Sequence, residues 1–189
     1  MRRLYLLLLL AFSVPLAVQA AERAYGGHPR QSMDFTPAAS DRAPLVLFIH
    51  GGAWAFGDKS AAAHMAAPFH ARGYAFAAIN YRLVPDVTVA QQAGDVAAAL
   101  AALTEDARPL GIDPSRIILI GHSAGAHLAA LVASDPRYLG AHGIPVETID
   151  GVVLLDGAGY DVPRQIAAAG PILRRMYLRA FGSDEPTQR

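Results

Sequence analysis

Short apolar runs alternate with longer segments of helical periodicity along most of the chain. Four runs of strand length cover residues 45–49, 74–79, 117–120 and 151–155. Apolar residues recur at helical spacing in the intervening and following segments, residues 60–72, 89–104 and 126–134. Buried strands that alternate with helices predict the α/β class, with a mostly parallel sheet and helices on both of its faces.

Two further features refine this arrangement. Residues 31–36 predict an earlier strand, antiparallel to its neighbour and at the edge of the sheet. For the helix over residues 60–72 we expect Ser60 to be the N-cap and Gly73 to lie just past the end. Pro68 lies inside this helix and can shorten or kink it.

Residues 1–20 have the layout of a secretory signal peptide. Arg2 and Arg3 precede an apolar stretch that runs to about Val18, and Val18-Gln19-Ala20 offers a small-x-small cleavage pattern. The stretch is shorter than the ~20 residues that span a bilayer, so an uncleaved anchor is the weaker alternative. We expect cleavage near Ala20 and a mature domain over residues 21–189. That domain would be periplasmic or secreted, with no stable membrane anchor.

The composition describes one globular domain and excludes several classes of partner. Apolar residues make up 53% of the 189 residues and charged residues only 17%, which is typical of a folded chain. The 16 basic and 16 acidic residues balance, so no charge excess favours nucleic acid or an anionic membrane surface. The sequence contains no cysteine, so an exported domain would depend on core packing and not on disulfides.

One short motif carries the strongest chemical signal. Gly121-His122-Ser123-Ala124-Gly125 directly follows the apolar run 117–120 and directly precedes the helical segment 126–134. A serine between glycines on a sharp turn from a buried strand into a helix is a nucleophile elbow. The sequence therefore predicts Ser123 as a nucleophile at the end of the sheet.

A second motif lies at the end of an earlier strand. His50-Gly51-Gly52-Ala53-Trp54 comes immediately after the run 45–49. The carboxyl ends of parallel strands meet at one rim, so this turn and the elbow are expected to lie side by side. Backbone N–H groups of a glycine-rich turn can stabilise the tetrahedral oxyanion of acyl transfer. The pair of motifs predicts acyl-transfer chemistry.

Four motifs in this order resemble the bacterial esterases related to hormone-sensitive lipase and their feruloyl-esterase-like carboxylesterase relatives. They are HGGAW with Gly57-Asp58-Lys59, Asn80-Tyr81-Arg82-Leu83, Gly111-Ile112-Asp113-Pro114-Ser115-Arg116-Ile117, and GHSAGAHLAA. The resemblance implies an α/β-hydrolase fold, Ser123 as catalytic nucleophile, and an oxyanion hole from the N–H groups of Gly52, Ala53 and Ala124. It also implies a small-molecule ester substrate and no cofactor. Ala53 departs from the glycine of many relatives, and alanine resists positive φ.

The histidine base and the acid that orients it are harder to place. Their order in this fold is serine, then acid, then histidine, and only His127 and His142 follow Ser123. His127 is one turn along the elbow helix, where we expect it to pack against the sheet. His142 lies beyond a helix that carries the chain roughly 18 Å away. Neither fits the base, and Asp156 after the fourth strand is the candidate acid.

The resemblance accounts for these missing partners. The sheet of the family continues with further strands that bear the acid and the base, so it implies that this domain is truncated at its C-terminus and has an open sheet edge. His50 is expected to steady the oxyanion turn. Three other histidines lack the spacing of a metal site, which predicts no bound metal: His28, His64 and His70.

The leading interpretation is a serine hydrolase that cleaves carboxylic esters through an acyl-enzyme, with activity severely reduced in this chain. Two alternatives stay open. An amidase-type relative, such as an arylformamidase or an exopeptidase, would use the same machinery on a different bond. A non-catalytic binding protein could also be built on this fold, since fold alone does not fix function.

Overall fold

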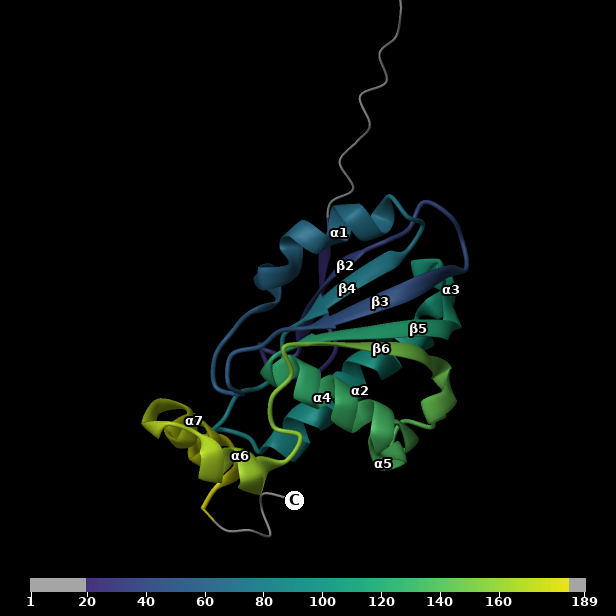
Figure 1. Cartoon of the computed structure of the whole chain (residues 1–189). Coiled ribbons are helices and arrows are strands. Elements are labelled where there is room, and N and C mark those ends of the chain that lie inside the picture. Colours follow the sequence, from purple (N-terminus) through teal and green to yellow (C-terminus); the bar gives the residue numbers. More distant parts are fainter. Residues whose placement is uncertain (1–19, 184–189) are drawn as a thin grey trace, which may run out of the picture.

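The computed structural model describes residues 20–183 (Figure 1). The predicted signal peptide therefore lies outside the described residues, apart from Ala20 at the expected cleavage point. Within residues 20–183, no helix combines the length and apolar character that a bilayer crossing requires.

Six strands form one mixed sheet in the order β1-β2-β4-β3-β5-β6. The four strands from β4 to β6 are parallel, whereas β2 is antiparallel to both β1 and β4. The strands are β1 Ala21–Ala24, β2 Ser32–Thr36, β3 Ala43–Ile49, β4 Ala75–Ile79, β5 Ile112–His122 and β6 Ile149–Leu155.

The helices connect the strands and cover both faces of the sheet. In Figure 1, α1 lies on one side, and α2, α4 and α5 lie on the other. The helices are η1 Lys59–Ala62, α1 Ala63–His70, α2 Val89–Glu105, α3 Ala107–Leu110, α4 Ala124–Ser134, α5 Pro136–Gly140, η2 Val146–Thr148, α6 Val162–Ala168 and α7 Pro171–Phe181. The predicted mostly parallel sheet with helices on both faces is confirmed.

Alternation along β3 divides the core between the two faces. Val46 and Phe48 contribute to the smaller apolar cluster, which includes Phe69 of α1. Leu45, Leu47 and Ile49 point the other way, into the large cluster shared with α2 and α4. Because both sets of side chains are buried, β3 needs a continuous apolar run, and that run is the signal that identified it.

The position of β2 corrects one prediction. β2 is antiparallel, as expected, but it is not the edge strand, because β1 pairs with its outer side. β1 has the sequence Ala-Glu-Arg-Ala and is mostly exposed. An edge strand that buries little apolar surface leaves no hydrophobic pattern, so β1 was not predicted.

The start of the helix after β3 corrects a second prediction. The chain enters it through the 3-10 turn η1, and the side chain of Asp58 accepts a hydrogen bond from the N–H of Ser60 at 2.9 Å. Asp58 is thus the N-cap in place of Ser60. Aspartate and serine are both favoured N-cap residues, and the carboxylate of Asp58 is close enough to accept from the Ser60 N–H.

Candidate active site

Ser123 occupies the junction between β5 and α4. Its backbone has φ 52° and ψ −117°, a sparsely populated conformation for a residue with a side chain. The Ser123 N–H donates to the carbonyl of Leu155 at 2.8 Å, so the end of β6 holds the turn in place. The strained turn between strand and helix is the geometry expected of a nucleophile elbow.

Two glycines allow the elbow to be this tight. A Cβ at Gly125 would collide with the carbonyl oxygens of Ile49 and His50, because the first turn of α4 presses onto the end of β3. A Cβ at Gly121 would collide with the backbone of Gly125 itself. The glycines of the motif are therefore required by close approach of backbone to backbone.

The turn after β3 has an unusual backbone. Gly52, Ala53 and Trp54 have φ values of 121°, 49° and 60° in succession. Ala53 thus adopts the positive φ that alanine ordinarily resists. Trp54 anchors the turn: its side chain is buried, and its carbonyl accepts hydrogen bonds from Val84 N–H at 3.0 Å and from Gln92 Nε2 at 2.7 Å. These contacts offset the local strain of the turn.

This turn and the elbow lie side by side. A Cβ built on Gly51 would be 3.1 Å from the Cβ of Ser123. Within residues 20–183, the N–H groups of Gly52, Ala53 and Ala124 donate no hydrogen bond. Ser123 is half-buried, and its hydroxyl has no partner in the same part of the chain. The structure therefore brings together the predicted nucleophile and three unsatisfied backbone donors.

His50 is buried behind the turn after β3 and stabilises it. It is 1% exposed, and its ring stacks on Tyr81 with centroids 4.3 Å apart. Its Nδ1 donates to the carbonyl of Gly51 at 2.7 Å, which assigns the neutral tautomer with the proton on Nδ1. Burial and the nearby guanidinium of Arg30 lower the pKa of His50 to about 4. His50 therefore holds the turn as a neutral ring, in agreement with the predicted supporting role.

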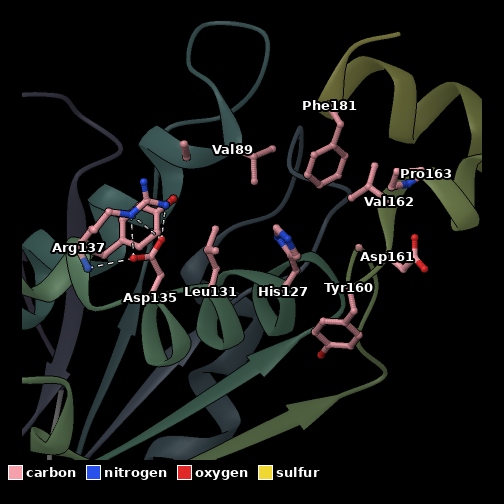
Figure 2. A pocket seen from close by; sticks show the side chains of 13 residues that line it. Val89, His127, Leu131, Asp135, Arg137, Tyr160, Asp161, Val162, Pro163 and Phe181 are labelled. Atoms are coloured by element: carbon pink, nitrogen blue, oxygen red, sulfur yellow. Dashed lines mark hydrogen bonds and ion pairs between the residues drawn. The ribbon is translucent and has the colours of Figure 1, made fainter. Parts of the chain in front are cut away.

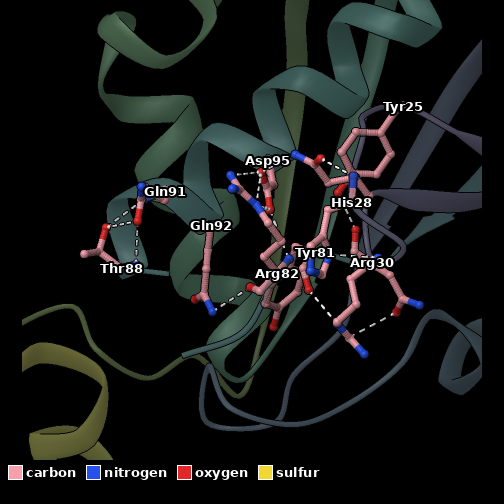
Figure 3. A network of polar contacts seen from close by, with 11 residues as sticks. Tyr25, His28, Arg30, Tyr81, Arg82, Thr88, Gln91, Gln92 and Asp95 are labelled. Atoms are coloured by element: carbon pink, nitrogen blue, oxygen red, sulfur yellow. Dashed lines mark hydrogen bonds and ion pairs between the residues drawn. The ribbon is translucent and has the colours of Figure 1, made fainter. Parts of the chain in front are cut away.

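Arg30 completes this support and was not predicted. Its guanidinium donates to the carbonyl of Tyr81 at 2.8 Å (Figure 3). It also donates to the carbonyl of Gly57 at 2.9 Å and lies 3.3 Å from Nε2 of His50. Arg30 belongs to the loop before β2, so these contacts join segments that lie far apart in the sequence. No local pattern in the sequence marks such a long-range contact.

His127 does not pack against the sheet, contrary to the expectation. In Figure 2 it projects from α4 toward Phe181. Its ring packs edge-on against the rings of Trp54 and Phe181, with centroids 5.6 and 5.5 Å away. Trp54 Nε1 donates to its Nδ1 at 3.4 Å, and burial lowers the pKa of His127 to about 4.

The same side chain borders a large cavity. His127, Leu131 and Asp135 follow one another along α4 and line a space of about 730 Å³ between this helix, the start of α2, and the segments around α6 and α7 (Figure 2). Asp135 pairs with Arg137 at 2.6 Å. The cavity lies along the helix and not at the elbow, and the ring of His127 contacts Trp54 and Phe181 and forms no hydrogen bond with the Ser123 hydroxyl.

Asp156 is exposed and directly follows Leu155, whose carbonyl binds the Ser123 N–H. It thus lies at the predicted rim of the sheet, with φ 47°. Within residues 20–183, neither Asp156 nor any histidine forms a hydrogen bond with the Ser123 hydroxyl. Its role as the acid stays a prediction. In that same region no cluster of three or more histidines, cysteines or carboxylates is arranged to hold a metal ion.

Comparisons with known proteins agree with this arrangement. The chain matches the BD-FAE family over residues 33–138, more than half of its length. A probable isoprenylcysteine alpha-carbonyl methylesterase of Arabidopsis thaliana is 36% identical over 108 residues, which are 56% of this chain and 26% of that protein. Kynurenine formamidase of Drosophila melanogaster is 32% identical over 117 residues, which are 61% of this chain and 38% of that enzyme. The chain thus spans well under half the length of these relatives.

Solved structures show the same fold. Esterase B from Lactobacillus rhamnosis aligns with a TM-score of 0.72 and 26% identity, over 87% of this chain and 56% of that chain. The expected α/β-hydrolase fold is therefore confirmed, and so is the resemblance to esterases. With matches in both sequence and structure, the chain belongs to the BD-FAE family and has the fold of the α/β-hydrolase esterases.

Proposed function

We propose that this protein is a serine hydrolase that acts on carboxylic esters through an acyl-enzyme formed on Ser123. The observation that carries the proposal is the strained elbow of Ser123 beside a turn with unsatisfied backbone donors. The esterase relatives support the same chemistry, since acyl transfer from an ester is what such a site can accelerate.

In the proposed mechanism each group has a role. Ser123 Oγ attacks the carbonyl carbon of the ester, and the N–H groups of Gly52, Ala53 and Ala124 stabilise the oxygen as it becomes negative. The C–O bond to the alcohol then breaks, and the alcohol leaves with the proton that the serine gave up. Water attacks the acyl-enzyme in the same way and releases the acid. Each oxyanion donor is worth on the order of 3 kcal/mol of barrier in enzymes of this kind.

We further propose that the chain of 189 residues turns over slowly. Serine at its ordinary pKa needs a base, and among the described residues no histidine forms a hydrogen bond with the Ser123 hydroxyl. Without base and acid, catalysis comes only from oxyanion stabilisation and substrate binding. An activated ester with a good leaving group depends least on proton transfer, so it is the substrate to use.

The test is acylation by 4-nitrophenyl butyrate. We expect slow release of nitrophenol, and a butyryl group on Ser123 detected by peptide mass spectrometry. Ser123→Ala should abolish both signals, whereas Ser134→Ala, at the far end of the same helix, should leave them unchanged. Equal nitrophenol release from the chain and from Ser123→Ala would overturn the assignment of the nucleophile. Rapid Ser123-dependent turnover would overturn only the proposed loss of activity.

An amide bond is the second candidate substrate, because kynurenine formamidase is among the relatives. The same nucleophile and donors would serve, but an amine is a poorer leaving group than an alcohol and depends more on a general acid. Comparing acylation by a 4-nitrophenyl ester with that by the matching 4-nitroanilide separates the two. We expect a strong preference for the ester.

A further inference from the structure

A small cavity opens directly beside the oxyanion turn. Its volume is about 280 Å³, and it lies between the segment after Gly52 and the helix α7. Its lining is apolar apart from two guanidinium groups. The lining residues are Ala53, Ala55, Phe56, Ile172, Arg175, Met176 and Arg179.

Trp54 fixes the distance between the two walls of this cavity. Its ring packs edge-on against Phe181 of α7 with centroids 4.7 Å apart, and against Tyr177 at 5.6 Å. These contacts seat the buried face of α7 on the turn that carries the proposed oxyanion donor Ala53. The opposite side of the helix, with Arg175 and Arg179, is left at the mouth of the cavity.

The two arginines are available to a ligand. Arg179 lies over the ring of Phe56, 5.7 Å from its centroid, but no carboxylate of residues 20–183 lies within 4.0 Å of Arg175 or Arg179. The apolar wall is likewise uncovered, since Phe56 is 55% and Ile172 is 79% exposed. Guanidinium groups bind carboxylates through paired hydrogen bonds, and uncovered apolar surface is stabilised by an apolar ligand.

We propose that this cavity binds the part of the substrate that flanks the ester carbonyl, and that this part is a short apolar chain ending in a carboxylate. The inference rests on the proposed function, because it places the ester carbonyl at Ser123 and the adjoining chain next to Ala53. The protein would then prefer half-esters of dicarboxylic acids over the corresponding neutral diesters.

Binding to the full chain carrying Ser123→Ala tests this without any turnover. Trp54 is the only tryptophan of the sequence and lies between the lining residues Ala53 and Ala55, so its fluorescence is the readout of occupancy. Monomethyl adipate carries the carboxylate, and dimethyl adipate is its neutral match. We expect the half-ester to bind roughly fivefold to tenfold more tightly, as two partly exposed charge pairs allow, and this preference to weaken as salt is added.

Two variants test which residues cause the preference for the half-ester. Arg175→Gln with Arg179→Gln should make the two ligands bind equally, whereas Arg174→Gln, on the same helix but outside the cavity lining, should keep the preference. Equal binding of both ligands to the unaltered cavity overturns the inference, as does a preference that survives the double variant. Circular dichroism checks that each variant is folded. Failure of Ser123 acylation would overturn the proposed function alone, because the binding measurement does not depend on it.

Discussion

At the scale of single residues, Gly125 shows how closely the elbow helix approaches the strand that precedes the oxyanion turn. A Cβ there would meet the backbone carbonyls of Ile49 and His50, which cannot rotate away as a side chain could. We expect Gly125→Ala to lower the free energy of unfolding by about 1–3 kcal/mol, the range of overpacked cores. Urea denaturation monitored by Trp54 fluorescence measures this.

Gly94 provides the matched control for that substitution. It lies in the middle of α2, and nothing is within 4 Å of the position that a Cβ would take. Alanine favours helix over glycine, so Gly94→Ala is expected to raise the free energy of unfolding by about 0.5–1 kcal/mol. A loss of stability at Gly94, or none at Gly125, would contradict the close approach described for the elbow.

One buried and one half-buried histidine make stability depend on pH. Burial lowers the pKa of both His50 and His127 to about 4, below the value of about 6.5 in an unfolded chain. Between these values the unfolded chain binds protons that the folded protein excludes. Stability is therefore complete above pH 6.5 and is lost as the pH falls toward 4, by up to about 1.4 kcal/mol per pH unit for each histidine.

A single substitution separates the two contributions. His127→Gln removes one titrating group and keeps an acceptor for Trp54 Nε1, so the loss of stability between pH 6.5 and pH 4 should become shallower by up to half. The exposed His142→Gln is the control and should leave the slope as it is. An unchanged slope in His127→Gln, measured by urea denaturation across this pH range, would show that its ring is not protected from protons in the folded state.

At the scale of elements, the start of η1, the turn that leads into α1, can be tested by comparing Asp58 with Ser60. Asp58 accepts from the N–H of Ser60 at 2.9 Å and from Nδ2 of Asn80 at 2.8 Å. We expect Asp58→Ala to cost about 1 kcal/mol or slightly more, as loss of a cap does, while Ser60→Ala stays within about 0.5 kcal/mol. Equal effects in thermal unfolding would restore Ser60 as the capping residue.

Elements with their own local signal could be predicted, and the others could not. β3 and residues 117–120 of β5 are largely buried on both faces and therefore appear as unbroken apolar runs, whereas the first half of β5 is polar and was not predicted. β1 is short and exposed, so only its pairing with β2 defines it. Helix α7 was also missed, although Pro171 at its first turn and Gly182 after its end are ordinary boundary signals.

At the scale of the whole molecule, some parts of the candidate site have a local sequence signal and others depend on tertiary contacts alone. Ser123 and the turn at Gly52 are local motifs at strand ends, and parallel strand order alone brings them to one rim. Arg30 and the arginines of α7 reach the site only through tertiary contacts, 20 to more than 100 residues away in the chain. Sequence patterns with periods of two or 3.6 residues carry no information on such contacts.

The outer edge of β6 bears on whether the protein self-associates. Within residues 20–183, β6 pairs only with β5, and its side chains Val153, Leu154 and Leu155 are 43%, 42% and 41% exposed. An apolar strand with free N–H and C=O groups is a template for pairing with another chain. We therefore expect the purified protein to self-associate as its concentration rises.

A charge on that edge should suppress the association, because a lysine at a strand pairing site has to be desolvated before a second strand can pair. Val153→Lys is expected to shift the onset of light scattering to higher protein concentration. Ala141→Lys adds the same charge at an exposed position after α5 and should not shift it. If both variants shift the onset equally, net charge and not the free edge governs association. If neither does, β6 is not the surface through which the chains meet.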